Sequence, residues 1–128
     1  MSELNKILYV EDEPDIQAVA SIALVDVGGL TLEICKSGKE ALAKAEDFNP
    51  DLLLLDVMMP EMDGPATLEA LRKLPVTANT PAIFMTAKVQ THEVAHFKSI
   101  GAIDVVAKPF DPMTLAQTLR EIWRDHDL

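Results

Sequence analysis

Short apolar runs alternate with longer amphipathic segments along the 128-residue chain. Five runs of four or five mostly aliphatic residues have the length and composition of buried strands, and they lie at 6–10, 31–35, 52–56, 81–85 and 104–107. Between them, apolar residues recur every three or four positions, which predicts helices with one buried face. Strands that alternate with helices predict βαβ units, and therefore a parallel sheet with helices on both faces.

Each expected helix has residues suited to its start or its end. The first helix follows Pro14 and stops at the glycines 28–29, and its apolar face is predicted to hold Ile16, Val19, Ala20, Ala23, Leu24 and Val27. Ser37 can cap the second helix, which ends before the turn at 49–51. The apolar positions of the third helix are Leu68, Leu71 and Leu74. The fourth helix covers roughly 91–100 and stops at Gly101. The fifth helix follows Pro112, and its apolar positions are Leu115, Leu119 and Ile122.

Length and composition predict one globular domain over residues 1–128. A chain of this length buries roughly two thirds of its unfolded surface, and a composition of 48% hydrophobic and 25% charged residues is typical of soluble proteins. No apolar run approaches the ~20 residues of a membrane span, and the start of the chain lacks the apolar core of a signal peptide. We therefore expect a cytoplasmic location and no membrane partner. The single cysteine, Cys35, cannot form an internal disulfide and is expected to be a small buried residue.

The net charge of −10 argues against direct binding to nucleic acid. Phosphate backbones require clustered Lys and Arg side chains, and the 11 basic residues of this chain are scattered. The excess of acidic residues is explained either by solubility or by acids gathered around a cation.

Polar residues stand where four of the predicted strands end. Glu11 and Asp12 follow the first strand, Asp56 ends the third, Thr86 follows the fourth and Lys108 follows the fifth. Ligands of doubly wound sheets bind beyond the carboxyl ends of the strands, so we expect these side chains at one edge. Two carboxylates about 4 Å apart repel each other by up to about 4 kcal/mol, and a cation is therefore expected among the three acids. Mg²⁺ fits better than Zn²⁺, because the chain has no cluster of Cys and His.

Four segments, "ILYVEDEP", "LLLLDVMMPEMDG", "IFMTA" and "AKPF", occur in this order along the chain. With them the chain resembles the receiver domain of two-component response regulators, of the single-domain, chemotaxis-like kind, over essentially its whole length. The resemblance implies a flavodoxin-like, doubly wound α/β fold whose five parallel strands have the order 2-1-3-4-5. It also implies a cis Lys108–Pro109 bond, and a loop after the third strand that is shaped by Pro60 and Gly64.

The same resemblance implies a role for each residue at the expected edge. Asp56 would accept a phosphoryl group from a phosphohistidine, and Thr86 and Lys108 would bind phosphoryl oxygens. Mg²⁺ would be organised by Glu11, directly or through water, and by Asp12, Asp56 and the main-chain carbonyl of Met58. The protein would be a signalling switch, not an enzyme, that catalyses only its own phosphorylation and dephosphorylation. Its partners would be a sensor histidine kinase or a histidine phosphotransfer protein and a downstream protein target, with the chain itself a monomer or a weak dimer.

One residue departs from the family pattern. Receiver domains usually carry Tyr or Phe three residues before the lysine, where this chain has Val105. Phosphorylation is then expected to be transmitted by some packing change other than the rotation of an aromatic ring. The departure also leaves open a pseudo-receiver that binds a partner without phosphorylation.

Two other classes of protein share part of this pattern. A haloacid-dehalogenase-like phosphatase also uses an Asp nucleophile and Mg²⁺, but it requires a second acid two residues later, where Met58 stands. A flavodoxin requires a phosphate-binding loop rich in Ser, Thr and Gly after the first strand, whereas "EDEPD" would repel a phosphate. Turnover of free phosphoesters and a flavin absorbance spectrum distinguish these two classes from a receiver.

Two further features are interpreted as structural. His92 and His96 are four residues apart on the expected fourth helix, which is a spacing that can bind a metal, but no third ligand is evident and a solvated helix face is expected. Trp123 lies near the end of the last helix. It belongs either to the core or to a partner-binding surface.

Overall fold

A computed structural model describes residues 3–127 of the chain. Five parallel strands form one sheet in the order β2-β1-β3-β4-β5. Their bounds are Lys6–Val10 for β1, Thr31–Cys35 for β2, Leu52–Asp56 for β3, Ala82–Thr86 for β4 and Asp104–Ala107 for β5. The predicted fold class and strand order are confirmed, and β4 lies one residue later than the pattern of hydrophobic residues predicted.

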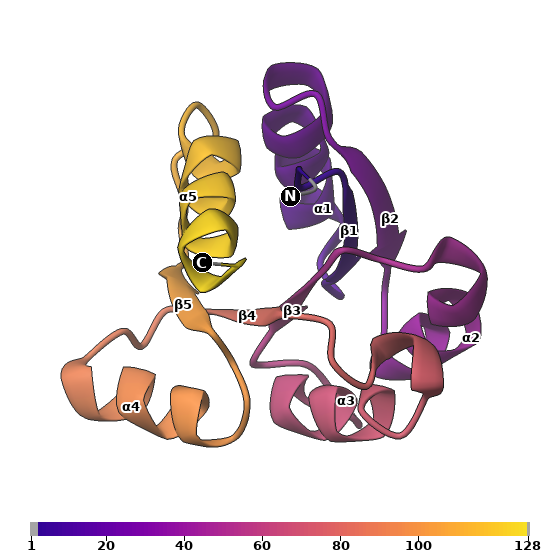
Figure 1. Cartoon of the computed structure of the whole chain (residues 1–128). Helices are drawn as coiled ribbons and strands as arrows, with labels where there is room; N and C mark the ends of the chain where they lie inside the picture. The colour runs from indigo at the N-terminus through magenta and orange to yellow at the C-terminus, as the bar shows by residue number, and fades with distance from the viewer. Residues whose placement is uncertain (1–2, 128) are drawn as a thin grey trace.

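Helices cover both faces of the sheet. Figure 1 shows α1 and α5 on one face and α2, α3 and α4 on the other. The bounds are Pro14–Ser21 for α1, continued by a π-helix at Ile22–Val27, then Gly38–Phe48 for α2, Gly64–Leu71 for α3, Thr91–Ser99 for α4 and Leu115–Asp127 for α5, with a 3₁₀ turn at Pro75–Thr77. Each face has its own hydrophobic cluster.

The central strands supply both clusters because successive side chains point to opposite faces. Leu52 and Leu54 of β3 pack on the side of α1 and α5, whereas Leu53 and Leu55 pack on the other side, and all four are fully buried. A strand that is buried on both faces needs apolar residues at every position. This explains the run of four leucines, and it makes the carboxylate that ends the run exceptional.

The first helix differs from its prediction. Its last six residues form a π-helix, whose i→i+5 bonds advance each residue by less than the 100° assumed for an α-helix. Ala20, Ala23 and Leu24 of the predicted apolar face are fully buried, but Val19 and Val27 are 40% and 44% exposed. The prediction that Val19 and Val27 belong to the buried face was therefore wrong.

The third helix also ends earlier than predicted. It stops at Leu71, so that Leu74 lies outside it and precedes the 3₁₀ turn that begins at Pro75. A residue before proline is disfavoured in the α conformation, and Leu74 has the extended backbone expected there. Its side chain still packs against the cluster under α2, α3 and α4.

Other local predictions are confirmed. The Ser37 hydroxyl accepts a hydrogen bond from the amide of Glu40 at 3.1 Å and caps α2. Gly101, with φ of 119°, follows α4 in a conformation that L side chains rarely adopt. For Trp123, which the sequence left open between core and surface, the structure shows a partly buried side chain packed against the core, with its indole donating to the carbonyl of Asp51 at 3.4 Å.

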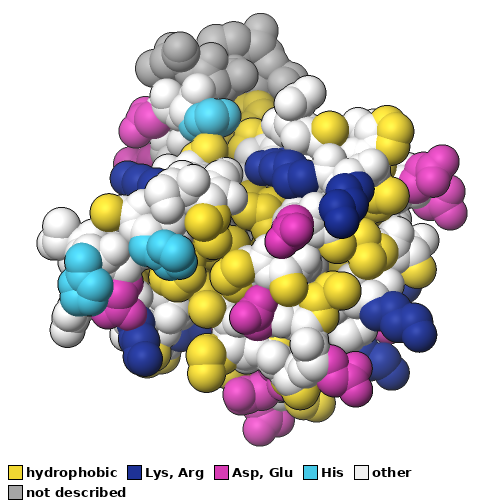
Figure 2. Space-filling model, turned by 90° about the horizontal axis from the view of Figure 1, so that it is seen from below, with side chains coloured by type: hydrophobic (Ala, Val, Ile, Leu, Met, Phe, Trp, Pro, Cys, Tyr) yellow, Lys and Arg dark blue, Asp and Glu magenta, His cyan; other side chains and the backbone are white. Residues whose placement is uncertain are grey.

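The surface carries mixed charges. Figure 2 shows Lys and Arg side chains at separate places on the lower face, among acidic and hydrophobic ones. Both His92 and His96 of α4 are exposed, as a solvated helix face requires. Within residues 3–127, no helix has the length and hydrophobicity needed to cross a bilayer.

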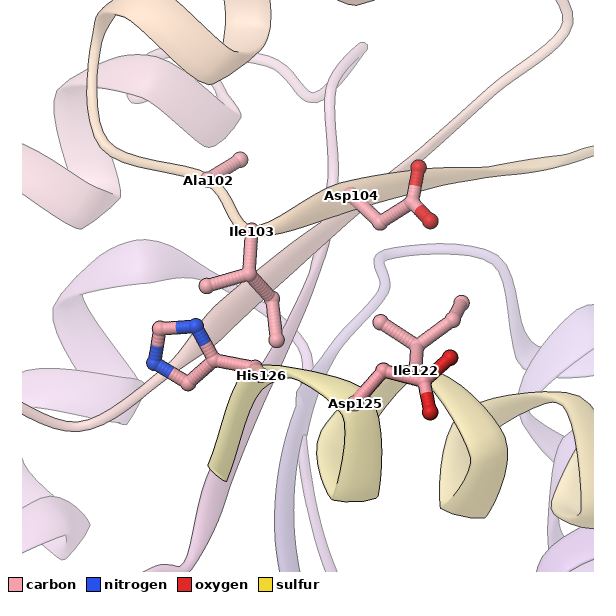
Figure 3. A pocket seen from close by; sticks show the side chains of 6 residues that line it. All are labelled: Ala102, Ile103, Asp104, Ile122, Asp125 and His126. Carbon is pink, nitrogen blue, oxygen red and sulfur yellow. The ribbon is translucent and has the colours of Figure 1, made fainter. Parts of the chain in front are cut away.

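A hollow lies at the amino-terminal end of β5, between that strand and the end of α5 (Figure 3). It is lined by Ala102, Ile103, Asp104, Ile122, Asp125 and His126. The polar residues discussed next lie at the other end of the strands.

Candidate functional site

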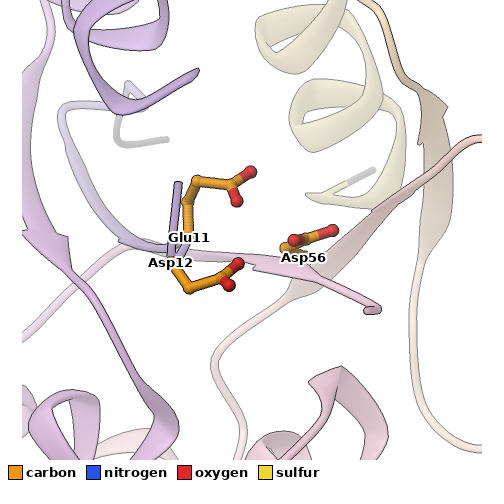
Figure 4. Close-up of side chains that lie close together, drawn as sticks. All are labelled: Glu11, Asp12 and Asp56. Carbon is orange, nitrogen blue, oxygen red and sulfur yellow. The ribbon is translucent and has the colours of Figure 1, made fainter. Parts of the chain in front are cut away.

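Three carboxylates meet at the carboxyl edge of the sheet. Glu11 and Asp12 follow β1 directly, and Asp56 is the last residue of the adjacent β3. Each offers one oxygen, and these oxygens lie within 4.8 Å of one another. Figure 4 shows the three side chains converging from the two strand ends. Across residues 3–127 this is the one group of three or more His, Cys, Asp or Glu residues close enough to bind a metal ion together.

Hydrogen bonds hold Glu11 in a fixed position. Its side chain is fully buried, and Oε1 accepts from the hydroxyl of Tyr9 at 3.3 Å and from Nζ of Lys108 at 2.9 Å. Oε2 accepts from the amide of Glu13 at 3.2 Å, and the side-chain amide of Gln17 donates to the main-chain oxygen of Glu11. Donors on both oxygens reduce the cost of burying this carboxylate.

Lys108 connects two of the acids. Its Nζ lies 2.9 Å from Glu11 Oε1 and 3.2 Å from Asp56 Oδ1. Burial alone would lower the pKa of Lys108, but the hydrogen bonds and charges of Glu11 and Asp56 outweigh that effect and raise it. The ammonium is therefore charged at neutral pH. The Lys108–Pro109 bond is cis, as the resemblance implied.

Asp56 is the most strongly perturbed of the acids. Its side chain is 4% exposed. Burial, together with the negative charge of Glu11, raises the pKa of Asp56 to about 6, against the opposing effect of Lys108. The single ammonium of Lys108 thus does not offset the combined effect of burial and of repulsion from Glu11.

Asp12 has a carboxylate oxygen that is free to bind a cation. Its Oδ1 is buried and has no hydrogen-bond partner among the described residues. A buried carboxylate oxygen without a donor is costly, and a hard divalent cation would satisfy it. Three carboxylates suit Mg²⁺, which prefers oxygen ligands and retains several waters. The residues present therefore fit the ion that receiver domains bind.

The loop after Asp56 approaches the strand end closely. A Cβ atom on Gly64 would lie 2.6 Å from the main-chain oxygen of Asp56, so no larger residue fits there without movement. The amide of Gly64 donates to the carbonyl of Val57 at 3.0 Å. Met58, the predicted carbonyl ligand, lies two residues beyond Asp56 in this loop, with its side chain 77% exposed.

Thr86 lies at the same edge of the sheet. It ends β4, is 4% exposed, and faces Ala107 of β5 in the strand register. Its hydroxyl accepts a hydrogen bond from the amide of Lys88 at 3.1 Å. The structure thus brings all the predicted residues to one edge, with Thr86 on the side of β4 and β5.

Two contributors were missing from the sequence analysis. Tyr9 and Gln17 both donate hydrogen bonds to Glu11. For Tyr9 the alternation of strand residues could have revealed the contact, because residues i and i+2 point to the same face. Gln17 lies six residues from Glu11, and only the path of the chain into α1 brings the two together.

The comparisons with known proteins agree with this geometry. Residues 7–120 match the family described as response regulator receiver domain. Regulatory protein AtoC of Escherichia coli (strain K12) is 36% identical over 111 residues, which is 87% of this chain and 23% of that protein. Transcriptional regulatory protein CpxR of Klebsiella pneumoniae is 37% identical over 121 residues, which is 94% of this chain and 50% of that protein. The chain thus spans from about a quarter to one half of the length of these relatives.

Solved structures show the same fold. The chemotaxis protein CheY4 of Vibrio cholerae has 34% sequence identity and a TM-score of 0.84, over 93% of this chain and 98% of that chain. The receiver domain of the Francisella response regulator 1452 has 28% identity and a TM-score of 0.81, over 95% of this chain and 98% of that chain. From the family match, the relatives and the shared architecture, the chain belongs to the response regulator receiver domains.

Proposed function

We propose that the chain accepts a phosphoryl group on Asp56 from a phosphohistidine, and that this modification switches a protein-binding surface. The proposal rests on the charged groups that surround Asp56. Its buried carboxylate lies beside Glu11 and Asp12, with Nζ of Lys108 at 3.2 Å. Receiver domains are signalling switches rather than classical enzymes, and a protein that phosphorylates itself needs a positioned nucleophile and compensating positive charge.

In the proposed reaction, a carboxylate oxygen of Asp56 attacks the phosphorus atom of the phosphohistidine. A P–O bond forms and the P–N bond breaks, and the imidazole leaves with the electron pair of that bond and takes up a proton from solvent. Lys108 stabilises the phosphoryl oxygens by charge, and the Thr86 hydroxyl binds them by hydrogen bonding. Mg²⁺, held by Glu11, Asp12, Asp56 and the carbonyl of Met58, would supply further positive charge.

The proposed output surface is formed by α4, β5 and α5. The loop from Ala87 to Gln90 joins Thr86 to α4, which packs on the sheet through Phe97, with its ring centroid 5.2 Å from that of Phe84. Val105 of β5 packs against the same cluster. Because valine has no ring to swing between buried and exposed positions, we propose a modest repacking of α4 against β5.

The partners follow from this proposal. A sensor histidine kinase or a histidine phosphotransfer protein would supply the phosphoryl group, and a downstream protein would bind the output surface. The chain would act in the cytoplasm as a monomer or a weak dimer. An acidic chain with scattered basic residues is not suited to bind nucleic acid through this domain.

Intact-mass measurement tests the proposal. After incubation with acetyl phosphate and Mg²⁺, the protein should gain the mass of one phosphoryl group, whereas Asp56→Asn should gain none. An equal gain by Asp56→Asn would show that the acceptor is another residue. No gain by the wild-type protein, from acetyl phosphate or from a phosphorylated histidine phosphotransfer protein, would favour the pseudo-receiver.

A further inference from the structure

Tyr9 places a hydroxyl inside the hydrophobic core, next to the acidic site. The residue is fully buried in β1, among apolar side chains of the cluster under α1 and α5. Its Oη donates to Glu11 Oε1 at 3.3 Å. A tyrosine hydroxyl is a hydrogen-bond donor at neutral pH, so this contact supplies Glu11 with a proton donor from inside the core.

Oε1 of Glu11 has a second donor, which is shared with the proposed phosphoacceptor. Lys108 Nζ lies 2.9 Å from Glu11 Oε1 and 3.2 Å from Asp56 Oδ1. A phosphoryl group on Asp56 adds negative charge on that side of the ammonium and draws Lys108 away from Glu11. Glu11 is fully buried, so water does not readily replace the lost donor.

The other donor to the carboxylate cannot compensate for this loss. The amide of Glu13 donates to Oε2, not to Oε1. When Lys108 turns to the phosphoryl group, the hydroxyl of Tyr9 is the donor to Oε1 that remains among residues 3–127. Without that hydroxyl, a buried carboxylate oxygen would lose its last protein donor on phosphorylation, which is unfavourable.

We propose that Tyr9 is a positioning residue that keeps Glu11 hydrogen-bonded while Lys108 moves from Glu11 to the phosphorylated Asp56. The inference rests on the proposed function, and it adds a residue that touches neither the phosphoryl group nor the metal. Tyr9 then favours the phosphorylated state over the unmodified state, in addition to packing in the core.

The test compares Tyr9→Phe with the wild-type protein, using beryllofluoride with Mg²⁺ as a mimic of the phosphoryl group. Phenylalanine keeps the ring, so the core remains filled and only the hydroxyl is lost. Fluorine NMR titration should show an affinity about tenfold weaker than wild type, or more, because that is the lower limit for the loss of one hydrogen bond to a charged group. Urea unfolding in the absence of Mg²⁺ verifies that the variant is folded.

A double-mutant cycle separates this role from a structural one. In a Lys108→Ala background, Glu11 has the same protein donors before and after modification, so Tyr9→Phe should change the affinity by less than about twofold. Thr77→Val is the matched control, because the buried Thr77 hydroxyl donates to the carbonyl of Leu71 at the opposite edge of the sheet. This control should lose stability and keep the wild-type affinity for beryllofluoride.

The outcomes are distinct. If wild type binds beryllofluoride and Tyr9→Phe binds equally well, the role of Tyr9 is overturned while the proposed function stands. An equal loss with and without Lys108, or a similar loss in Thr77→Val, would also overturn it, since the effect would then be structural. A wild-type protein that binds no beryllofluoride would overturn the proposed function and this inference together.

Discussion

Removing the charge of Asp56 should stabilise the protein when Mg²⁺ is absent. Burial and the charge of Glu11 raise the pKa of Asp56 from 3.8 to about 6, and one pKa unit corresponds to about 1.4 kcal/mol. At pH 7 the ionised side chain therefore destabilises the folded state by up to about 3 kcal/mol. Asn has the size of the protonated acid without its charge, so Asp56→Asn should raise the free energy of unfolding by roughly 2–3 kcal/mol. In a chain of this length the gain corresponds to roughly 10 °C in melting temperature.

The sign of this effect determines its dependence on pH. Because the pKa of Asp56 is higher in the folded than in the unfolded state, the stabilisation by the bound proton is complete below about pH 3.8 and is lost by about pH 6. The advantage of Asp56→Asn over wild type should therefore be full above pH 6 and shrink towards pH 4.

Urea unfolding in EDTA at several pH values between 4.5 and 7.5 measures this advantage. Asp47→Asn, at an exposed position of α2, is a control for the removal of one negative charge and should change stability by less than about 0.5 kcal/mol. Mg²⁺ at a hundredfold excess over its dissociation constant should stabilise wild type by about 2.7 kcal/mol and largely remove the advantage of Asp56→Asn. If Asp56→Asn is no more stable than wild type in EDTA at pH 7, or if the difference is the same at every pH, burial and repulsion of the ionised Asp56 do not destabilise the folded state as argued.

Two further predictions concern the metal and the output surface. Asp12→Ala should weaken Mg²⁺ binding by about tenfold or more, as measured by titration calorimetry. Even the loss of a residue that only supports a metal ligand weakens metal binding by that much. An unchanged affinity would contradict the assignment of Asp12 as a ligand. Beryllofluoride with Mg²⁺ should change amide chemical shifts in three segments, which are 56–60, 86–100 and 104–110. Asp56→Asn should show none of these changes. Shifts confined to the residues that bind phosphate, with a partner that still distinguishes the phosphorylated form, would place the switch on another surface.

Local patterns were sufficient to predict the elements and their order. Strands and helices follow from the spacing of apolar residues, which depends on near neighbours in the chain. The run from Leu52 to Leu55 shows this directly, because only a strand buried on both faces accepts four leucines in succession. The ends of elements were predicted less well, as the π-helix at Ile22–Val27 and the end of α3 at Leu71 show.

The residues of the candidate site were predictable because parallel strands bring their carboxyl ends to one edge. Glu11, Asp12, Asp56, Thr86 and Lys108 all follow from that rule together with the positions of the strand ends. Their contacts did not follow from it. Lys108 and Glu11 are 97 residues apart, and the distance between their charged groups depends on side-chain packing at the end of the folded sheet.

Tertiary structure alone determined the electrostatics of the site. The raised pKa of Asp56 arises from burial and from the charge of Glu11, and neither is a property of the residue type. The unpartnered Oδ1 of Asp12 and the hydroxyl of Tyr9 at Glu11 likewise depend on the distances between side chains that the fold brings together. Residue types and their periodicity therefore determined which groups reach the edge of the sheet, whereas the folded structure decided which of them pair, because hydrogen bonds and desolvation act over a few ångströms in space.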